Sequence, residues 1–561
     1  MPTLLWHGIN QSAVATISLS ALVKNEPKAR ALFDRLSIAV LLAVAGVVLA
    51  TFRDYGLGWD DYTHSEYGDL LVKLYASGFS DRRALSFVNL YMYGGGFDML
   101  AALTAKALPF TLFETRRLVG GLIGLLGLVA TWRTGRRVGG PLAGFLALVL
   151  LATCPLYIGH MFMNAKDAPF AAAMALLLYA LVRMFETYPV LTPANGSLAA
   201  AGFGLSIGSR IMGGFGVIEL AAGLAFAGSL DAIKQGVRPA AKRLGRYLAW
   251  LIPVALLAYA VMALVWPWSV TSLLNPLRAV VYFSSFFEKP WHELFGGELT
   301  LVTQMPRSYV PTLLALQLPE ILLGLALAGA AGAAIAVCRR ELAASRRVVL
   351  LVILIAAIAP IAAAVAARPA MYNGIRHFVF VLPPIAVLGG LAGARLLEWL
   401  WEKSHSAASV AGLTLIAATA LPVIAMARLH PYEYTYYNTL AGGVAGARSR
   451  YMLDYWALSF KQASQGLAAF LSERHERKPQ DRRWKLAVCG PHRSPQVELG
   501  PDFETTWDPQ GADFAMMLGE FYCLTFDAPL VTEVVREGVV YARVYDIRGR
   551  SFTTLLSTPA P

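Results

Sequence analysis

Few side chains of this 561-residue sequence carry a charge, and few are cysteine. Asp, Glu, Lys and Arg make up 15% of the chain, whereas 57% of its residues are hydrophobic, which excludes the usual composition of soluble globular domains. The four cysteines are too few for a dense disulfide framework, and no CxxC pair with metal-binding spacing is present. Although the net charge is +12, no basic stripe with interleaved aromatic residues supports a nucleic-acid surface. The composition therefore indicates a membrane protein.

The N-terminal segment lacks the pattern of a cleavable signal peptide. Residues 1–35 are mixed in polarity and contain no compact apolar stretch followed by a small-residue cleavage site. Lys24, Lys28, Arg30 and Arg35 precede the first apolar run. Because basic residues concentrate on the cytoplasmic side of membrane proteins, we expect residues 1–35 to form a cytoplasmic segment.

Long apolar runs are what the sequence has in abundance. A spanning helix needs about 20 mostly apolar residues, and about eleven runs approach that length, which predicts a polytopic α-helical membrane protein. The fifth and sixth runs are separated only by Ser209 and Arg210, so they form either a re-entrant pair or one broken helix. The runs cover residues 36–51, 118–132, 142–158, 168–185, 198–207, 211–227, 247–266, 311–337, 348–367, 378–397 and 408–426.

Basic clusters between the runs agree with a cytoplasmic N-terminus. If each run crosses the membrane once, the clusters at residues 133–137, 234–246 and 339–347 all lie on the cytoplasmic side. We therefore expect an integral protein of a bacterial inner membrane, with a transmembrane domain over residues 36–427. The predicted external segments are the first loop, 52–117, the links 159–167, 267–310 and 368–377, and everything after residue 428.

The last part of the chain, residues 428–561, has no further spanning run. Alternating apolar and polar residues at 531–546 are typical of a strand. We expect a small C-terminal α/β domain in the periplasm. An oxidising periplasm could join Cys489 to Cys523, and two separate buried thiols fit the sequence nearly as well.

The first external loop opens with an acidic and aromatic cluster. Asp60 and Asp61 lie between Trp59 and Tyr62. Any single charged loop residue is most often only solvated, but two adjacent carboxylates flanked by aromatic rings indicate more. One could act as a general base towards an acceptor. The other could bind a cation or a substrate amine, or position the first carboxylate.

The link at 159–167 supports two interpretations of Asp167. It could cap the helix that Pro169 opens. Alternatively, Asn164, Lys166 and Asp167 face the first-loop carboxylates across one external cavity. The two roles are compatible, because a residue at a helix start is held rigidly.

Basic residues at the external boundary are candidates for binding a lipid phosphate. An arginine there often only extends to the headgroups, but it is also the best bidentate partner for a phosphate. Arg210, Lys166 and Arg376 are the candidates. Tyr372 and His377 lie beside Arg376 in the sequence, although a lone histidine at a helix start is more often structural.

Several tyrosines follow the last apolar run. Tyr432, Tyr434, Tyr436 and Tyr437 could form a platform for a sugar. Because Tyr and Trp concentrate where helices leave the membrane, an interfacial belt is the favoured interpretation.

Together these motifs resemble the GT-C glycosyltransferases, in particular the group of protein O-mannosyltransferases and aminoarabinose transferases. The resemblance covers about residues 36–426 and depends on short motifs. Asp60 and Asp61 match an acidic pair in the first external loop, where Asp-Glu is commoner. Asp167 opens an acid-Ala-Pro motif, and Arg376-His377 opens a run that ends in Pro-Pro, with His where Tyr is common.

The resemblance implies a polyprenyl-phosphate sugar donor, an inverting transfer, and a lipid, glycan or protein acceptor outside the membrane. Asp60 would be the general base, and Asp61 and Asp167 would orient it. No zinc is expected, and a divalent cation held by these three acids stays an open alternative. Cations would neutralise the leaving phosphate. The implied substrate-binding residues are Asn164, Lys166, Arg210, Tyr372, Arg376 and His377.

Two other classes of protein share parts of this pattern. A secondary transporter is also polytopic and rich in glycine, and a break near Arg210 is typical of transporters. Transporters place ionisable residues inside their spans, whereas these runs hold almost no carboxylate, Glu219 being the plainest exception. A polymerase or ligase of surface polysaccharide would use the same lipid-linked donor and stays an alternative.

Overall fold

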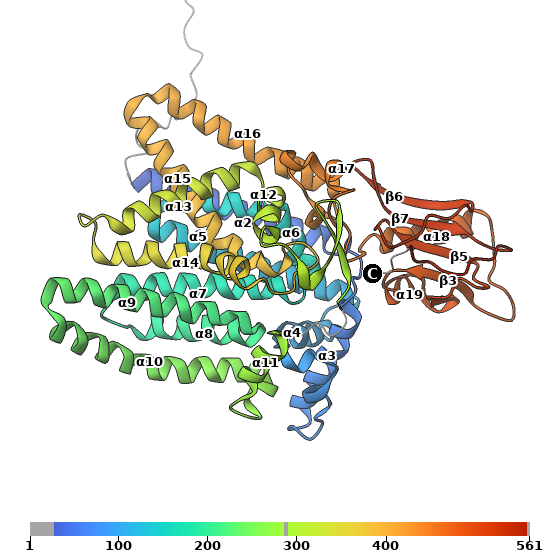
Figure 1. The fold of residues 1–561 in the computed structure, drawn as a ribbon, viewed down its shortest axis with the longest axis horizontal. Helices are drawn as coiled ribbons and strands as arrows, with labels where there is room; N and C mark the ends of the chain where they lie inside the picture. The colour runs from blue at the N-terminus through green and yellow to red at the C-terminus, as the bar shows by residue number, and fades with distance from the viewer. Residues whose placement is uncertain (1–26, 285–289, 558–561) are drawn as a thin grey trace, which may run out of the picture.

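The computed structural model describes residues 27–284 and 290–557, so the predicted cytoplasmic segment lies mostly outside the described residues. A bundle of long helices runs side by side, and a smaller region containing a sheet follows at one end (Figure 1). Within the described ranges, nine helices are long and apolar enough to cross a membrane. The chain is thus a polytopic α-helical membrane protein with a C-terminal α/β region, as predicted.

The long helices are α2 (Pro27–Thr51), α5 (Leu112–Ala152), α7 (Asp167–Thr187), α8 (Pro193–Ser209), α9 (Phe215–Gln235), α10 (Val237–Val265), α13 (Glu320–Cys338), α14 (Ala344–Ala367), α15 (Leu382–Lys403) and α16 (His405–Leu429). The shorter helices are α3 (Asp61–Ala76), α4 (Gly96–Ala105), α6 (Pro155–Met163), α11 (Asn275–Ser284), α12 (Tyr309–Gln317) and α17 (Gly443–Ala447). The 3-10 turns are η1 (Arg83–Ser86), η2 (Leu90–Met92), η3 (Ile211–Gly214), η4 (Pro267–Val270), η5 (Val302–Gln304), η6 (Arg376–Val381), η7 (Glu433–Thr435), η8 (Thr439–Ala441) and η9 (Gly500–Asp502).

Helix α5 contains two predicted runs because the chain reverses inside it. Gly140 has a φ of 84°, which a residue with a Cβ rarely adopts, and Pro141 follows it. A Cβ on Gly135 would lie 3.0 Å from that of Ala147, so the two halves pack against each other. Counting the two halves of α5 separately adds one segment to the nine apolar helices, and the shorter α8 adds another. The total then agrees with the predicted number of about eleven runs.

Helices α8 and α9 are separate, so their two runs do not form one broken helix. Arg210 between them has extended backbone, with a φ of −147° and a ψ of 141°. The turn η3 then starts α9, which runs back through the bundle. The reversal leaves the Arg210 side chain at the same end of the bundle as the first loop.

The segments predicted to be external gather at one end of the bundle. Helices α3, α4 and α11 lie at the end that carries the sheet, and the α9–α10 turn, near the basic cluster 234–246, lies at the opposite end (Figure 1). The hairpin of β1 (His292–Phe295) and β2 (Glu298–Leu301) is antiparallel. Which end faces the cytoplasm stays a prediction.

The C-terminal region contains a five-stranded sheet in the order β4-β3-β5-β7-β6. Strand β3 is parallel to its two neighbours, whereas β7 is antiparallel to both of its own. A disulfide joins Cys489, at the end of β3, to Cys523 after β5, which is typical of an oxidising compartment. The elements are α18 (Phe460–Glu473), β3 (Trp484–Cys489), α19 (Arg493–Leu499), β4 (Phe503–Thr506), β5 (Phe514–Leu518), β6 (Leu530–Arg536) and β7 (Val539–Asp546).

The tyrosines after α16 do not form an interfacial belt. Tyr432 and Tyr434 are fully buried, and Tyr432 stacks on Tyr541 of β7 with ring centroids 5.2 Å apart. Tyr434 donates a hydrogen bond to Asp454. The belt prediction was therefore wrong, because the C-terminal region covers these rings and uses them as the core that joins it to the bundle.

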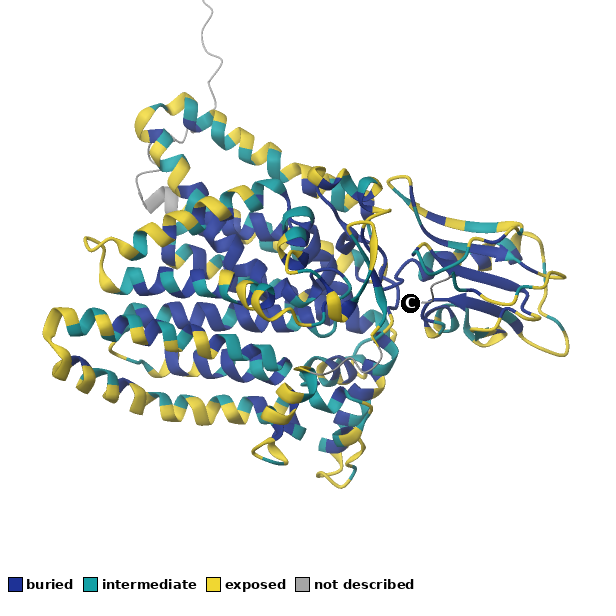
Figure 2. Cartoon of the chain, viewed as in Figure 1, coloured by how far each residue is buried: buried dark blue, intermediate teal, exposed yellow. Residues whose placement is uncertain are grey.

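Outer helices expose apolar side chains along much of their length. Figure 2 shows α10 and α16 largely exposed, in contrast to the buried centre of the bundle. Leu256 on α10 and Leu413 on α16 are each 67% exposed. Apolar side chains in continuous exposed faces are expected where lipid is the solvent.

Candidate active site

The two adjacent acids of the first loop have different surroundings. Asp61 is 2% exposed, and Arg117 of α5 donates hydrogen bonds to both of its oxygens, one of them over 2.9 Å. The backbone N–H of Gly58 also donates to Asp61, over 2.7 Å. A Cβ on Gly58 would lie 1.5 Å from the Trp456 ring, so only glycine fits this turn. Asp61 therefore fixes the start of α3 to α5.

Asp60 faces a cavity instead. Its side chain is 39% exposed, with Lys166 Nζ 3.4 Å and Arg376 Nη1 4.0 Å from its Oδ2. Burial raises the pKa of the Asp60 carboxyl, but the charges of Lys166 and Arg376 outweigh it and hold that pKa well below its usual range. At neutral pH the group is a carboxylate between two cations.

The cavity in front of Asp60 has a volume of about 670 Å³. The bundle side contributes Trp59 and Asp60 to its lining, and the C-terminal region contributes Trp456, Trp507 and Tyr522. Trp59 stacks on Trp507, with ring centroids 6.1 Å apart. The C-terminal region thus forms part of the cavity wall, which is both polar and aromatic.

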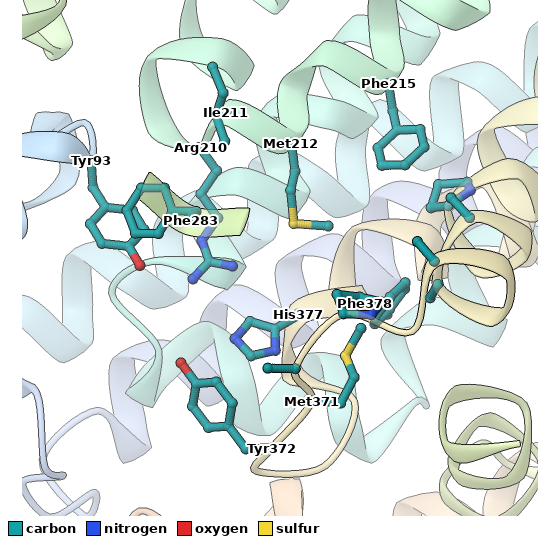
Figure 3. A pocket seen from close by; sticks show the side chains of 16 residues that line it. Tyr93, Arg210, Ile211, Met212, Phe215, Phe283, Met371, Tyr372, His377 and Phe378 are labelled. Atoms are coloured by element: carbon teal, nitrogen blue, oxygen red, sulfur yellow. The ribbon is translucent and has the colours of Figure 1, made fainter. Parts of the chain in front are cut away.

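A second cavity, of about 320 Å³, is mainly apolar. Met212 of η3 and Phe215 of α9 line it, together with Ala364 of α14. Figure 3 shows Met212, Phe215, Phe378 and Met371 around this space, with the guanidinium of Arg210 at one side. The two cavities share three lining residues, so an apolar space adjoins a polar one at this point. The shared residues are Tyr93, Arg210 and Tyr372.

Asp167 and Asn164 support the arginine at this junction. Asp167 Oδ1 lies 2.6 Å from Arg210 Nη1, and Asn164 donates to the other oxygen over 2.8 Å. The side-chain oxygen Oδ1 of Asn164 accepts hydrogen bonds from the backbone N–H groups of Lys166 and Asp167. Helix α7 starts at Asp167 without a side-chain cap from the preceding residue. The capping interpretation of Asp167 was therefore wrong, because its carboxylate is committed to Arg210 and Asn164.

Arg376 is held between two aromatic rings. Its guanidinium carbon lies 4.7 Å from the Tyr372 ring centroid and 4.6 Å from that of Trp456. Arg376 is 5% exposed, yet its Nε and Nη1 have no hydrogen-bond partner among the described residues. The ring of His377 meets Tyr372 edge-on and lines the apolar cavity. Arg376 therefore offers donors at the junction.

The structure brings some predicted site residues together and places others behind them. Asp60, Lys166 and Arg376 line the polar cavity, and His377 lines the apolar one. Arg210 and Tyr372 belong to both cavities. The remaining predicted residues, Asp61, Asn164 and Asp167, lie in the protein interior and hold charged neighbours.

Glu293 is a cavity residue that no sequence motif indicated. It is 3% exposed and accepts hydrogen bonds from the Tyr309 hydroxyl over 2.8 Å and the Asn373 backbone N–H over 2.6 Å. These contacts fix the link that carries Tyr372 and Arg376. Burial raises the pKa of Glu293 to about 7, against the opposing effect of its hydrogen bonds. Its partners are distant in the sequence, so no local pattern could identify it.

Among residues 27–284 and 290–557, no group of three or more His, Cys, Asp or Glu side chains is placed to hold a metal ion. The three acids considered for a divalent cation each pair with a different basic residue. These pairs are Asp60 with Lys166, Asp61 with Arg117, and Asp167 with Arg210.

The fold and the site define a polytopic membrane protein with a cavity at one membrane surface, walled in part by a C-terminal α/β region. This fold is similar to the crystal structure of ArnT from Cupriavidus metallidurans bound to undecaprenyl phosphate, with 16% identity over 92% of this chain and 99% of that one and a TM-score of 0.48. It is also similar to the oligosaccharyltransferase AglB from Archaeoglobus fulgidus in complex with an inhibitory peptide and a dolichol-phosphate. That match has 15% identity over 81% of this chain and 62% of that one, with a TM-score of 0.45.

Both neighbours are membrane glycosyltransferases of the GT-C superfamily, the class that the sequence motifs resemble. At these identities and TM-scores below 0.5, neither a substrate nor a residue's role follows from the likeness. No family model and no curated protein matches this chain.

Proposed function

We propose that this protein is an inverting glycosyltransferase that moves a sugar from a polyprenyl-phosphate donor to an acceptor hydroxyl outside the membrane. The carrying observation is the junction of the two cavities, where Lys166, Arg210 and Arg376 gather beside one exposed carboxylate, Asp60. Cations alone would suit any anion. An apolar cavity on one side and a polar, aromatic cavity on the other suit an anion that joins a lipid chain to a sugar.

The donor fits the two cavities in one orientation. Its polyprenyl chain would occupy the apolar cavity beside Met212 and Phe215, because burial of hydrocarbon is favourable there. Its phosphate would accept hydrogen bonds from Arg376, whose Nε and Nη1 have no hydrogen-bond partner among the described residues. Arg210, held by Asp167, would contribute a second charge. The sugar would then lie in the polar cavity.

Asp60 is the proposed general base. The acceptor oxygen attacks the anomeric carbon from the side opposite the phosphate, so the configuration inverts. The bond from that carbon to the phosphate oxygen breaks, and its electron pair leaves with the polyprenyl phosphate. Lys166, Arg210 and Arg376 stabilise the charge that develops there. Asp61 keeps Asp60 in place through the start of α3 and takes no direct part.

The test is sugar transfer in membranes. Wild-type protein, Asp60→Asn and the matched control Asp69→Asn are incubated with a set of radiolabelled undecaprenyl-phosphate sugars and a membrane extract as acceptor. We expect transfer from one donor by wild type and Asp69→Asn, and a loss of about 10²- to 10⁴-fold in Asp60→Asn. Asp69 lies on α3 outside the cavity lining.

Three outcomes would contradict the proposal. Equal transfer by Asp60→Asn and wild type would remove the general-base role. Transfer from none of the donors, together with ion-coupled uptake of a solute into vesicles, would favour a transporter. Extension of a glycan by many sugars from the same donor would instead indicate a polymerase.

A further inference from the structure

A buried chain of three charged or titratable side chains ends in the wall of the polar cavity. His64 lies one helical turn after Asp60, and its backbone N–H donates to the Asp60 carbonyl over 3.0 Å. Its Nδ1 lies 2.6 Å from Asp98 Oδ2 on α4. Arg116 of α5 donates to the other oxygen of Asp98 over 2.7 Å. The three residues are at most 3% exposed, so this buried group of side chains is rigidly held.

The other ring nitrogen of His64 is Nε2. Nε2 is buried and unpaired among the described residues, and His64 is part of the cavity lining. Because the Asp98 carboxylate can only accept hydrogen bonds, it holds the proton of a neutral imidazole on Nδ1. Nε2 then carries a free lone pair. This is the arrangement of a proton acceptor with a positioning carboxylate behind it.

Asp60 by itself is poorly suited to keep a proton. The charges of Lys166 and Arg376 outweigh its burial and hold its pKa well below the usual range. A proton taken up by Asp60 is therefore readily passed on to a neutral acceptor nearby.

We infer that His64 is the terminal proton acceptor of the transfer reaction, with Asp98 and Arg116 as its positioning residues; this inference rests on the proposed function. As the acceptor's O–H bond breaks and its oxygen bonds to the anomeric carbon, the proton moves to Asp60 and on to Nε2 of His64. The phosphate oxygen leaves with the electron pair of its broken bond. The Asp98 carboxylate stabilises the imidazolium, which later releases the proton to water.

The rate should then depend on the neutral form of His64. Only the neutral ring can accept another proton, so replacing the ring should change how the rate depends on pH. The charged groups facing it are Asp98 from α4, Arg116 through Asp98, and Asp60. Asp60 titrates too low to cause a change near neutral pH. Glu293, with a pKa of about 7, is another cavity group whose titration could change the rate near neutral pH.

The experiment compares pH profiles of sugar transfer by wild type, His64→Gln, Asp98→Asn and the exposed control His475→Gln. The donor is the undecaprenyl-phosphate sugar that wild type uses. Binding of undecaprenyl phosphate is measured in parallel, because that lipid would contact the cations and not His64. We expect His64→Gln to lose about 10²-fold in kcat, to lose the fall in rate at acidic pH, and to bind the lipid normally.

Asp98→Asn tests the same chain without removing the imidazole. Its amide can hold the ring in the wrong tautomer, with the Nε2 proton towards the cavity, so we expect a similar loss of kcat with normal lipid binding. This variant decides the question if His64→Gln does not fold.

A rate within threefold of wild type in these variants would overturn the inference. So would an unchanged fall in rate at acidic pH, which would assign that titration to Glu293. An absence of transfer by wild type with every donor would overturn the proposed function, and the inference with it.

Discussion

Asp60 and Asp61 are neighbours in the sequence but belong to different regions of the molecule. Asp61 lies in the interior, where Arg117 balances its charge. Asp60 is partly exposed to a cavity and lies beside two cations that also line that cavity. Successive residues at the start of a helix point about 100° apart, so one side chain can enter the bundle while the next faces outwards. The difference shows that an acidic pair can combine one structural group with one chemical group.

The largest expected effect is on the structural side of this comparison. Asp61→Asn would leave the Arg117 guanidinium buried without a countercharge, which costs about 3–5 kcal/mol. We expect a clear fall in the free energy of unfolding in detergent, followed by circular dichroism. Asp69→Asn, on the same helix and without that contact, should leave the unfolding curve unchanged.

A double variant separates charge from packing. Replacing Asp61 by Leu and Arg117 by Met together removes both charges, and such replacements of buried ion pairs are often neutral or stabilising. We expect the double variant to unfold at higher denaturant than Asp61→Asn. If both unfold alike, the two groups contribute by shape and not by charge, and the comparison with Asp60 fails.

A smaller effect is expected on the chemical side, at Arg376. In Arg376→Lys the charge remains, but the planar group between Tyr372 and Trp456 and its paired donors are lost. We expect kcat for sugar transfer to fall about 10²-fold without loss of stability. Arg307→Lys, at an exposed position outside both cavities, is the matched control. An unchanged kcat would mean that only the charge of Arg376 matters.

The helical part of the fold could be predicted from the sequence because lipid imposes a simple rule. Each span must be long, apolar and helical, so runs of suitable length correspond to helices even where Gly140 reverses the chain inside α5. The aromatic segment around Tyr434 was misinterpreted, because its burial depends on the C-terminal region folding back over it. Composition describes an average environment and not this contact.

The candidate site could be predicted only as separate motifs. The sequence indicated Asp60, Lys166 and Arg376, which meet in one cavity. Only the family resemblance separated Asp60 from Asp61. The residue pattern alone could not, because the deciding partner, Arg117, lies 56 residues beyond Asp61. An arginine at the start of an apolar run is a signal that could have been used, since a buried charge needs a partner.

The smallest expected effect concerns the apolar cavity, where no charge is involved. Ala363 of α14 lines this cavity and its neighbour Ala362 does not, although both are exposed. Phenylalanine at 363 would occupy space proposed for the polyprenyl chain, so Ala363→Phe should weaken undecaprenyl-phosphate binding about tenfold, or about 1.4 kcal/mol. Because the site around Asp60 is untouched, kcat at saturating donor should stay near that of wild type, as it should in the control Ala362→Phe. Equal binding by both variants would place the lipid chain elsewhere and leave the polar cavity as the whole site.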